Sequence, residues 1–461
     1  MNILSILMQC KYTSFLIVIT VNILATTGDS TISWTSPVFP KLMSNDTTVN
    51  PLERRITKHE DSIIGSILNV GALIGPLIFN FITRRFGYKY TLLGLAIPHI
   101  ISFLVLAFAR SIYLYYAARF LAGISLGAGY SLFSLYVGEI SDDSNRGGMI
   151  VITNIFWSLG NFLPLAIGPY TSIMSFNLIL TVLPVLFFVL FFGIGIESPY
   201  YLIRQKKEEQ AEEALMYLRG KQKKDITEEL NKIKTFVETS TEGRIHDIFT
   251  DKVLRKSLLI CILLLATQDL GGYCSILYHL TLIFKAAGSE ISEDTAALIV
   301  GIGLFASSFL APFLVDYFGR RPLLITSAIG MGVSLGLLGL FFFLHHHHYG
   351  IDIIKFLPLL SLICYIISYN LGINTVPWTL ISELFPSSVK QEASTIGAFC
   401  CWFTTAVVTF SYNYLNDALG VHGTFWLFAC WCLFSATFCF IFVPETKGKS
   451  FIEVQKMLYA K

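Results

Sequence analysis

The sequence predicts an all-α membrane protein in which twelve transmembrane helices form two six-helix halves, with a small cytoplasmic helical segment between them. Of the 461 residues, 54% are hydrophobic and 14% are charged, whereas an average soluble domain carries about 25% charged residues. Apolar runs long enough to cross a bilayer occur in two sets of six. Three short motifs recur in both sets at nearly the same spacing, which indicates an internal duplication.

Each apolar run has the length that an α-helix needs to span the hydrocarbon core, roughly 20 residues. Six runs precede a polar, lysine-rich interval and six follow it. We expect the spans at roughly 14–36, 62–82, 90–109, 112–137, 149–170, 175–195, 256–284, 296–315, 322–344, 356–382, 393–415 and 421–443.

The polar interval divides the chain into three parts. We expect an N-terminal six-helix half over 1–202, a cytoplasmic helical linker over 203–255, and a C-terminal six-helix half with a cytoplasmic tail over 256–461. The first apolar run is also compatible with a signal peptide, because Lys11 precedes it and small residues follow near Ala25. The run continues beyond that point, which favours a transmembrane helix.

The distribution of Lys and Arg among the loops gives the orientation. Basic residues concentrate in the loops that are cytoplasmic if both termini are cytoplasmic, and the short loops 171–174 and 416–420 hold none. The loop 37–61, which then lies outside, is the exception, because it holds Lys41, Arg54, Arg55 and Lys58, offset by nearby Asp and Glu. Its Asn45-Asp46-Thr47 sequon is accessible to glycosylation only on that side, which agrees with the orientation. We therefore expect a multi-pass plasma-membrane protein with Asn45 as a glycosylation candidate.

Three motifs at cytoplasmic helix ends occur once in each half. Gly87 and Gly319, Glu139 and Glu383, and Glu197 and Glu445 are separated by 232, 244 and 248 residues. Nearly constant offsets predict two halves with the same topology, and such bundles bind substrate between the halves near the bilayer midplane. The paired motifs are "RRFGYK" (84–89) with "DYFGRR" (316–321), "YVGEISDDSNRG" (136–147) with "LISELFPSSVK" (380–390), and "ESPYYL" (197–202) with "PETKG" (444–448).

With these motifs, the chain resembles the sugar porter family of the major facilitator superfamily over nearly its whole length. "ESPYYL" and "WTLISELFPSSVK" are most similar to the insect trehalose and glucose transporter branch. The resemblance implies the major facilitator fold and secondary transport by alternating access. It also implies a small sugar as partner, protons as a second partner in coupled members, the lipid bilayer as environment, and no cofactor.

The stretch "QDLGGYCSILYH" (268–279) carries polar residues inside an apolar span. Gln268, Gly272, Ser275 and His279 follow one another at helical spacing and predict a polar stripe that faces protein or a water-filled cavity. Packing of helices through small residues also explains the glycines and the serine. It does not explain why Gln268 adjoins Asp269.

The resemblance aligns this stretch with "QQLSGINAVFYY" of the family, which contacts sugar hydroxyls. Asp269 then replaces an amide, Cys274 an asparagine, and Leu304 a polar residue of the eighth helix. Asp269 either accepts a hydrogen bond from a substrate hydroxyl or binds a proton during the cycle. Carried over residue by residue, the substrate-binding candidates are Asn154, Gln268, Asp269, Cys274, Asn374, Trp378 and Trp402.

The charged residues of the repeated motifs imply, through the resemblance, a cytoplasmic latch that holds the outward-open state. Ordinary positive-inside anchors are the alternative, but anchors alone do not require matched carboxylates. Arg84 departs from the family, which usually has an acid there. The latch candidates are Arg85, Lys89, Glu139, Arg146, Glu197, Asp316, Arg320, Arg321, Glu383, Lys390 and Glu445.

Two further ionisable residues, Asp29 and Arg119, fall inside predicted spans. We predict that neighbouring helices bring them together. An acid–arginine pair there resembles the proton-coupling pair of proton–sugar symporters, and a static buried ion pair is the alternative.

We therefore expect a secondary transporter for a small sugar, hexose or trehalose-like, or for a polyol, either facilitative or proton-coupled, and not an enzyme. The sequence has no Gly-Lys-Ser/Thr phosphate-binding loop, so ATP-driven pumping is not expected. It also has no basic cluster with interleaved aromatic residues, so nucleic-acid binding is not expected. The His345–His348 run has no flanking carboxylate or cysteine, so no metal site is expected. A sugar sensor with a transporter fold is the alternative function.

Overall fold

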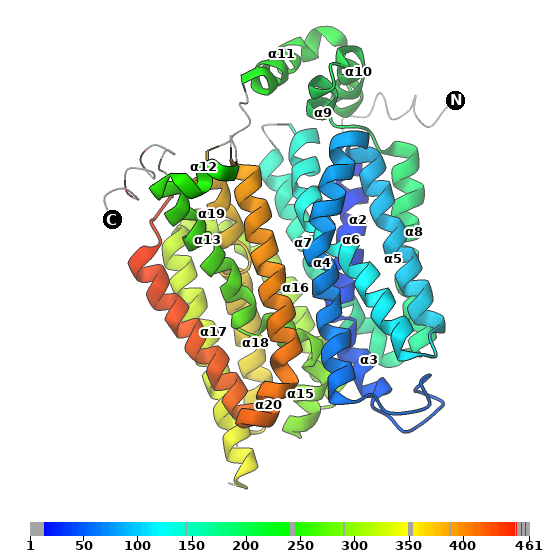
Figure 1. Cartoon of the computed structure of the whole chain (residues 1–461), viewed down its shortest axis with the longest axis vertical. Coiled ribbons are helices and arrows are strands. Elements are labelled where there is room, and N and C mark those ends of the chain that lie inside the picture. Colours follow the sequence, from blue (N-terminus) through cyan, green and yellow to red (C-terminus); the bar gives the residue numbers. More distant parts are fainter. Residues whose placement is uncertain are drawn as a thin grey trace.

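The computed structural model is a bundle of long helices with a smaller helical cap at one end (Figure 1). It describes residues 13–142, 145–239, 245–288, 291–348, 354–386 and 389–447, together with 449, 453 and 457. Within these residues, eleven helical segments are long and apolar enough to cross a membrane. The last segment, Glu392–Phe442, contains Gly420 at φ 73° and ψ 162°, where one helix ends and an antiparallel one begins. The expectation of twelve spans is thereby confirmed.

The N-terminal half forms one side of the bundle in Figure 1. The boundaries agree with the predicted spans to within a few residues, except that the first helix is extended by a short one at its outer end. The elements are α2 (Thr13–Ser33), α3 (Thr35–Leu42), α4 (Lys58–Phe86), α5 (Tyr88–Phe108), α6 (Ile112–Ile140), α7 (Arg146–Ile167), the 3₁₀ turn η1 (Gly168–Tyr170) and α8 (Ile173–Ile194).

The segment between the halves holds four helices, α9 (Pro199–Arg204), α10 (Glu208–Arg219), α11 (Lys223–Thr239) and α12 (Ile245–Thr250). Of these, α9, α10 and α11 form the cap, and α12 lies beside α13 (Lys252–Leu270) at the end of the second half (Figure 1). Buried Arg219 donates hydrogen bonds to the carbonyl oxygens of Ile140 and Ser141 and forms an ion pair with Glu229 at 2.6 Å, which ties the cap to the end of α6.

The C-terminal half differs from the first in that two of its spans are interrupted. The seventh span breaks at Gly271 and Gly272, the second of which has φ +87° and therefore ends α13. The tenth breaks over 372–375. The elements are α13 (Lys252–Leu270), α14 (Tyr273–Tyr278), α15 (Leu280–Ala287), α16 (Glu293–Phe318), α17 (Arg320–His346), α18 (Leu357–Leu371), α19 (Val376–Leu384) and α20 (Lys390–Phe442).

The break at Gly272 corrects one prediction. A single polar stripe from Gln268 to His279 requires an uninterrupted helix, and the seventh span is instead three helices. A periodicity argument does not detect the break, because it depends on a positive φ angle and not on hydrophobicity.

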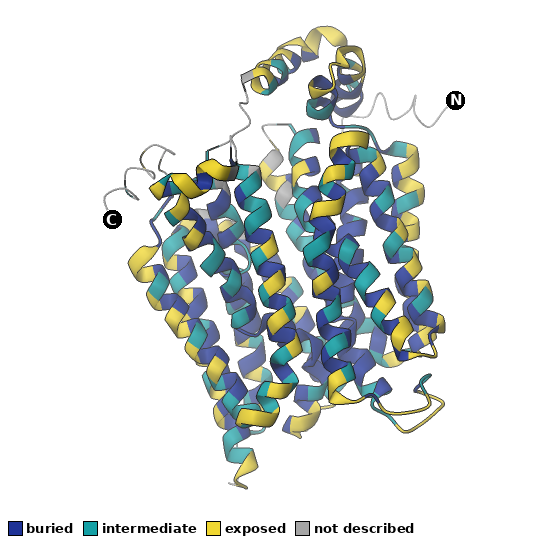
Figure 2. Ribbon diagram, viewed as in Figure 1, coloured by how far each residue is buried: buried dark blue, intermediate teal, exposed yellow. Residues whose placement is uncertain are grey.

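Large apolar side chains project from the outer faces of the bundle. Phe313, Phe192 and Phe440 are among the most exposed of them, and Figure 2 shows exposed residues distributed along the outside of the long helices. Apolar residues on the outside of a helical bundle are suited to contact with lipid acyl chains. The structure therefore places the polar residues that are buried within spans toward the interior of the protein.

Candidate functional site

A cavity of about 60 Å³ lies between the two halves. That volume holds a few water molecules. Helices of both halves contribute to its wall, as expected for a substrate cavity of a two-half transporter. It is lined by Asp29, Ile32, Tyr130, Asn154, Trp157, Ser158 and Asn161 from the first half, and by Gln268, Asp269, Tyr273, Cys274, Tyr369, Asn374, Trp378, Cys401, Trp402 and Thr405 from the second.

All seven residues that the sequence nominated for substrate binding line this one cavity. The breaks in the second half bring them there. Gln268 lies in the last turn of α13 and donates hydrogen bonds to the carbonyl oxygens of Ile373 and Asn374, at 2.9 and 3.1 Å, in the gap between α18 and α19. Discontinuous helices expose backbone groups of this kind next to the substrate in many transporters. Leu304 is buried and lies outside the residues that line the cavity.

Asp269 is 3% exposed and has one satisfied oxygen. Its Oδ2 accepts a hydrogen bond of 2.5 Å from the hydroxyl of Thr405. Its Oδ1 is buried and accepts no hydrogen bond from the part of the chain that the structure describes. The Cys274 thiol, a weak donor, and the Cys274 backbone N–H lie beside the carboxylate, but neither reaches Oδ1 with hydrogen-bond geometry. A buried acceptor without a donor is rare and costly, so this oxygen is available to a ligand.

Asp29 lies on α2 across the same cavity and is also 3% exposed. Its two oxygens accept hydrogen bonds from the hydroxyl of Tyr130, at 2.8 Å, and from the amide of Asn161, at 2.6 Å. Neither donor was found from sequence, because both come from other helices more than 100 residues along the chain.

The structure does not bring Asp29 and Arg119 together, so the predicted pairing was wrong. The buried guanidinium of Arg119 donates to the carbonyl oxygens of Thr31 and Ile64 and lies over the ring of Trp34, 5.3 Å from its centroid. Backbone oxygens and an aromatic face take the place of the carboxylate as partners of the cation. Arg119 therefore joins α6 to α2 and α4 within the first half.

Aromatic side chains form much of the cavity wall. The rings of Tyr130 and Trp157 stack with centroids 4.5 Å apart, and Trp402 meets Tyr130 edge-on at 5.3 Å across the two halves. Tyr273 and Tyr369 stack at 3.9 Å. Such rings present flat apolar faces to a ligand and carry polar edges. Of this group, sequence comparison nominated Trp402 alone.

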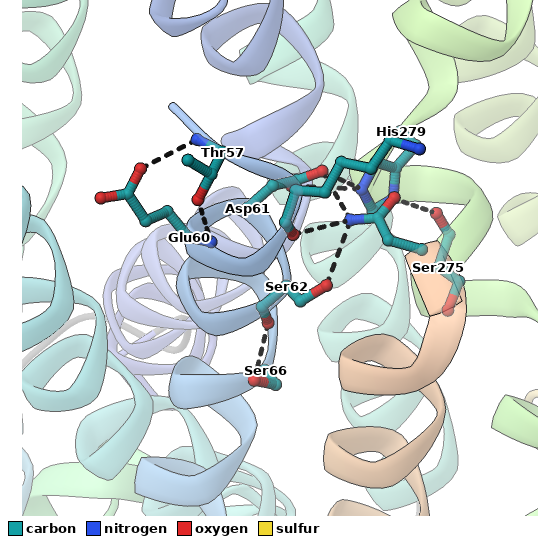
Figure 3. Close-up of polar contacts among 9 residues, drawn as sticks. Thr57, Glu60, Asp61, Ser62, Ser66, Ser275 and His279 are labelled. Atoms are coloured by element: carbon teal, nitrogen blue, oxygen red, sulfur yellow. Dashed lines mark hydrogen bonds and ion pairs between the residues drawn. The ribbon is translucent and has the colours of Figure 1, made fainter. Parts of the chain in front are cut away.

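At the end of the bundle away from the cap, polar contacts join the two halves. Figure 3 shows Asp61 of α4 facing His279, which joins α14 to α15. The imidazole Nε2 lies 3.2 Å from Asp61 Oδ2, and Nδ1 lies 3.0 Å from the carbonyl oxygen of Ser275. Both ring nitrogens face acceptors, and the doubly protonated ring satisfies both. The amide of Asn413 on α20 donates to Asp61 at 2.8 Å and completes this contact.

Local structure at the start of α4 positions this contact. Thr57 caps the helix, because its hydroxyl accepts a hydrogen bond from the backbone N–H of Glu60 and the Glu60 carboxylate accepts one from the N–H of Thr57 (Figure 3). Arg54 holds the same carboxylate in an ion pair at 2.5 Å. Asp61 follows in the first turn, where a negative charge is favourable.

At the end of the bundle that carries the cap, one ion pair expected in the second half is present (Figure 1). Arg320 forms an ion pair with Glu383 at 2.9 Å, and the hydroxyl of Thr446 donates to the other oxygen of Glu383 at 2.5 Å. Glu445 accepts hydrogen bonds from the backbone N–H groups of Arg320 and Arg321, at 3.1 and 3.0 Å. The guanidinium of Arg321 donates to the carbonyl oxygen of Phe440 instead. Lys390 acts on Glu383 through its charge.

Within the described part of the first half, neither Arg85 nor Lys89 forms an ion pair with Glu139 or Glu197. The pairing of Arg146 stays untested, because its side chain lies outside the described residues. Glu197 accepts hydrogen bonds from the backbone N–H groups of Tyr88 and Lys89, at 2.8 and 3.2 Å. Glu139 accepts from the hydroxyl of Ser198, and its cation is Arg204 at 3.9 Å, a residue that the sequence did not nominate.

The remaining latch candidates divide into two groups. Arg85 is exposed and lies over the ring of Phe86, and Lys89 meets Glu197 through its backbone and its charge. The side chains of Arg146 and Asp316 lie outside the described residues. Asn45, the glycosylation candidate, is exposed in the loop between α3 and α4.

Known proteins give a consistent picture of this architecture. The family model for Sugar (and other) transporter matches residues 30–458. The facilitated trehalose transporter Tret1 of Polypedilum vanderplanki is 32% identical over 454 residues, which are 98% of this chain and 89% of that protein. The corresponding protein of Bombyx mori is 30% identical over 407 residues, 87% of this chain and 80% of that protein.

Among solved structures, the inward open conformation of the xylose transporter XylE from E. coli superposes with a TM-score of 0.79 at 22% identity, covering 96% of this chain and 99% of that one. A second structure of XylE, partially occluded and inward open, gives a TM-score of 0.77 at 22% identity, covering 95% and 99%. At this identity the likeness establishes the fold, the twelve-helix major facilitator fold. The match over residues 30–458 establishes the family: this chain belongs to the Sugar (and other) transporter family.

Proposed function

We propose that this chain is a secondary transporter that moves a small sugar, hexose or trehalose-like, or a polyol across the plasma membrane by alternating access. The cavity between the halves is the observation that carries the proposal. Amide groups of Asn154, Gln268 and Asn374 line it together with Trp378 and Trp402, and hydrogen-bonding groups beside aromatic rings match the hydroxyls and the apolar ring faces of a sugar.

Alternating access follows from where the contacts between the halves lie. Among the ion pairs of the described residues, the two that join the halves, Lys58 with Asp417 and Asp61 with His279, are both on the outer side. The cytoplasmic clusters each lie within one half. The cavity is thus closed toward the outside, and separation of the outer contacts is the step that opens it there.

The relatives guide the choice of substrate. Those named above are trehalose transporters, and the comparisons offer no support for the sensor alternative. Trehalose is larger than a cavity of about 60 Å³, so its binding requires the halves to separate. We therefore place trehalose, glucose and a polyol on the panel of test substrates.

The experiment is uptake of labelled trehalose, glucose and sorbitol by cells that express the full chain, measured per surface copy. We expect saturable uptake of at least one of them. Uptake with and without a pH gradient distinguishes the two modes, because a facilitative carrier equilibrates its substrate in both conditions and a proton-coupled carrier accumulates it only along the gradient. No uptake or binding of any sugar or polyol contradicts the proposal.

Trp378→Ala provides the test of the site. Loss of the indole removes an apolar face from the cavity, and we expect an affinity about tenfold weaker per surface copy. Trp431→Ala is the matched control, because Trp431 contacts Phe434 away from the cavity. Equal affinities of the two variants contradict the placement of the site.

A further inference from the structure

The cavity is lined by two carboxyl groups, which is more acid than a neutral sugar requires. Asp29 approaches it from the first half and Asp269 from the second, and each is 3% exposed. The residues that line the cavity include no Lys, Arg or His. Neither carboxylate forms an ion pair with a described residue, because Arg119 is held by backbone oxygens and His279 by Asp61. Two buried carboxylates therefore face one small space without a counter-charge from the protein.

The hydrogen bonds favour the ionised form of both groups. The hydroxyl of Tyr130 and the amide of Asn161 donate to Asp29, and the hydroxyl of Thr405 donates to Asp269. Donors directed at a carboxylate stabilise its charge. An uncompensated charge at this depth is nevertheless unfavourable, so a positive charge that enters the cavity is bound strongly.

The position for such a charge is defined by two observations. The Oδ1 atom of Asp269 is buried and accepts no hydrogen bond from the described chain. Tyr273, stacked on Tyr369, lines the same cavity as Asp29 and Asp269. Aromatic faces beside carboxylates are the usual environment of a bound ammonium group. The amide of Asn154 and the amide oxygen of Asn374 remain for hydroxyl groups, since the Asn374 NH2 group donates to Asn370 Oδ1 at 2.8 Å.

We propose that the transported solute is a hydroxylated organic cation, such as an amino sugar, whose ammonium group binds at Asp269 in the cavity that Asp29 also lines. This inference rests on the proposed transport function and specifies its substrate class. Asp269 is the residue that determines the preference, because its free oxygen accepts an ammonium N–H. Asp29 contributes charge, since its own oxygens are already occupied.

The test compares three ligands of one ring type on the full chain: glucosamine, which is cationic, and glucose and N-acetylglucosamine, which are neutral. Uptake and thermal stabilisation of the purified protein are both measured at neutral pH. We expect glucosamine to bind at least about tenfold more tightly than either neutral sugar, which corresponds to about 1.4 kcal/mol. In Asp269→Asn we expect the ratio between glucosamine and glucose to fall toward one.

Glu53→Gln is the control for non-specific attraction of a cation, because Glu53 is an exposed carboxylate of the outer loop. Its ratio should equal that of the wild type. Transport of glucose without a preference for glucosamine overturns this inference and leaves the proposed function standing. So does a preference that persists in Asp269→Asn. If a pH gradient drives glucose uptake in the wild type but not in Asp269→Asn, Asp269 binds a proton during transport. That result also overturns the inference. Failure of every sugar to bind or enter overturns the proposed function itself.

Discussion

At the end of the bundle that carries the cap, the two halves share one arrangement of backbone and differ in the described partners of their glutamates. Gly87 and Gly319 have nearly the same conformation, with φ of 86° and 90° and ψ of 176° and 170°. Each glycine precedes a helix whose first two N–H groups donate to a glutamate, Glu197 in the first half and Glu445 in the second. A carboxylate at a helix N-terminus satisfies free donors and the helix dipole together.

The difference lies one residue after each glycine. In the second half this residue is Arg320, which forms an ion pair with Glu383. In the first half it is Tyr88, whose hydroxyl lies 3.4 Å from Glu139. The first half thus has a neutral donor where the second has a cation.

The ion pair between Arg320 and Glu383 links the charged residues of the second half to the cavity through α19. Glu383 belongs to α19, the half-helix that also carries Trp378, and Arg320 begins α17. An ion pair at this place fixes one end of the interrupted tenth span. Glu139 lies at the end of α6, an uninterrupted helix. We infer that the shared glycine and carboxylate are structural, and that the ion pair of the second half additionally controls the position of α19.

The largest effect is expected from replacing the glycines. Their φ and ψ values lie in a region that only glycine adopts readily, at a cost of about 1–3 kcal/mol for another residue. A Cβ atom at position 87 would lie 2.2 Å from Glu197 Oε2, and one at position 319 would lie 2.9 Å from Glu445 Oε2. We expect both Gly87→Ala and Gly319→Ala to reduce surface expression and thermal stability severely, with Gly87→Ala the worse.

Gly138→Ala is the matched control, because a Cβ atom there meets nothing within 4 Å. Its expression should equal that of the wild type. If Gly87→Ala and Gly319→Ala behave like this control, the shared arrangement of the two halves is not required for folding.

A smaller effect, on transport more than on folding, is expected from the carboxylates. Glu383→Gln removes the negative charge that pairs with Arg320, whose side chain is 15% exposed. We expect a loss of about 1–3 kcal/mol, between the values for exposed and buried pairs, and a lower transport rate. Glu139→Gln keeps an acceptor for Ser198 and should lower the rate less. Transport per surface copy measures both, and equal rates contradict the proposed role of the second cluster.

The spans, the cavity and the contacts of the buried charged residues differ in how far the sequence predicts them. Length, hydropathy and the repeated motifs predict the twelve spans and their two halves, because each span must hide its backbone and expose apolar side chains. The resemblance places Gln268 and Trp402 at one cavity. The partners of Asp29 and Arg119 depend on how helices rotate against one another, and the break at Gly272 depends on one dihedral angle. Neither has a signal in hydrophobic periodicity.

Tyr88 and Arg320 occupy equivalent positions in the two halves, so the role of the cation can be tested by placing a tyrosine at position 320. Arg320→Tyr gives the second half the donor of the first, and we expect transport to fall by less than in Arg320→Leu, because a phenol still donates to Glu383. The measurement is transport rate per surface copy for the two variants. If Arg320→Tyr is as slow as Arg320→Leu, the cation itself is required. If Arg320→Leu transports at the full rate, the ion pair has no role in the cycle.

The smallest effect is expected from Arg204, the cation that the first half uses. Its guanidinium lies 3.9 Å from Glu139, and its side chain is 50% exposed. Exposed ion pairs at such separation contribute about 0–1 kcal/mol, and salt screens them. Arg204→Gln should therefore change transport and stability little, and less at high than at low ionic strength. The matched change in the second half, Arg320→Gln, should be clearly more harmful at both salt concentrations, because its pair with Glu383 is shorter and better shielded from water. Thermal unfolding of the two purified variants at low and high salt measures this difference. If Arg204→Gln is as destabilising as Arg320→Gln, the first half depends on Arg204 as much as the second half depends on Arg320. The proposed difference between the two halves is then wrong.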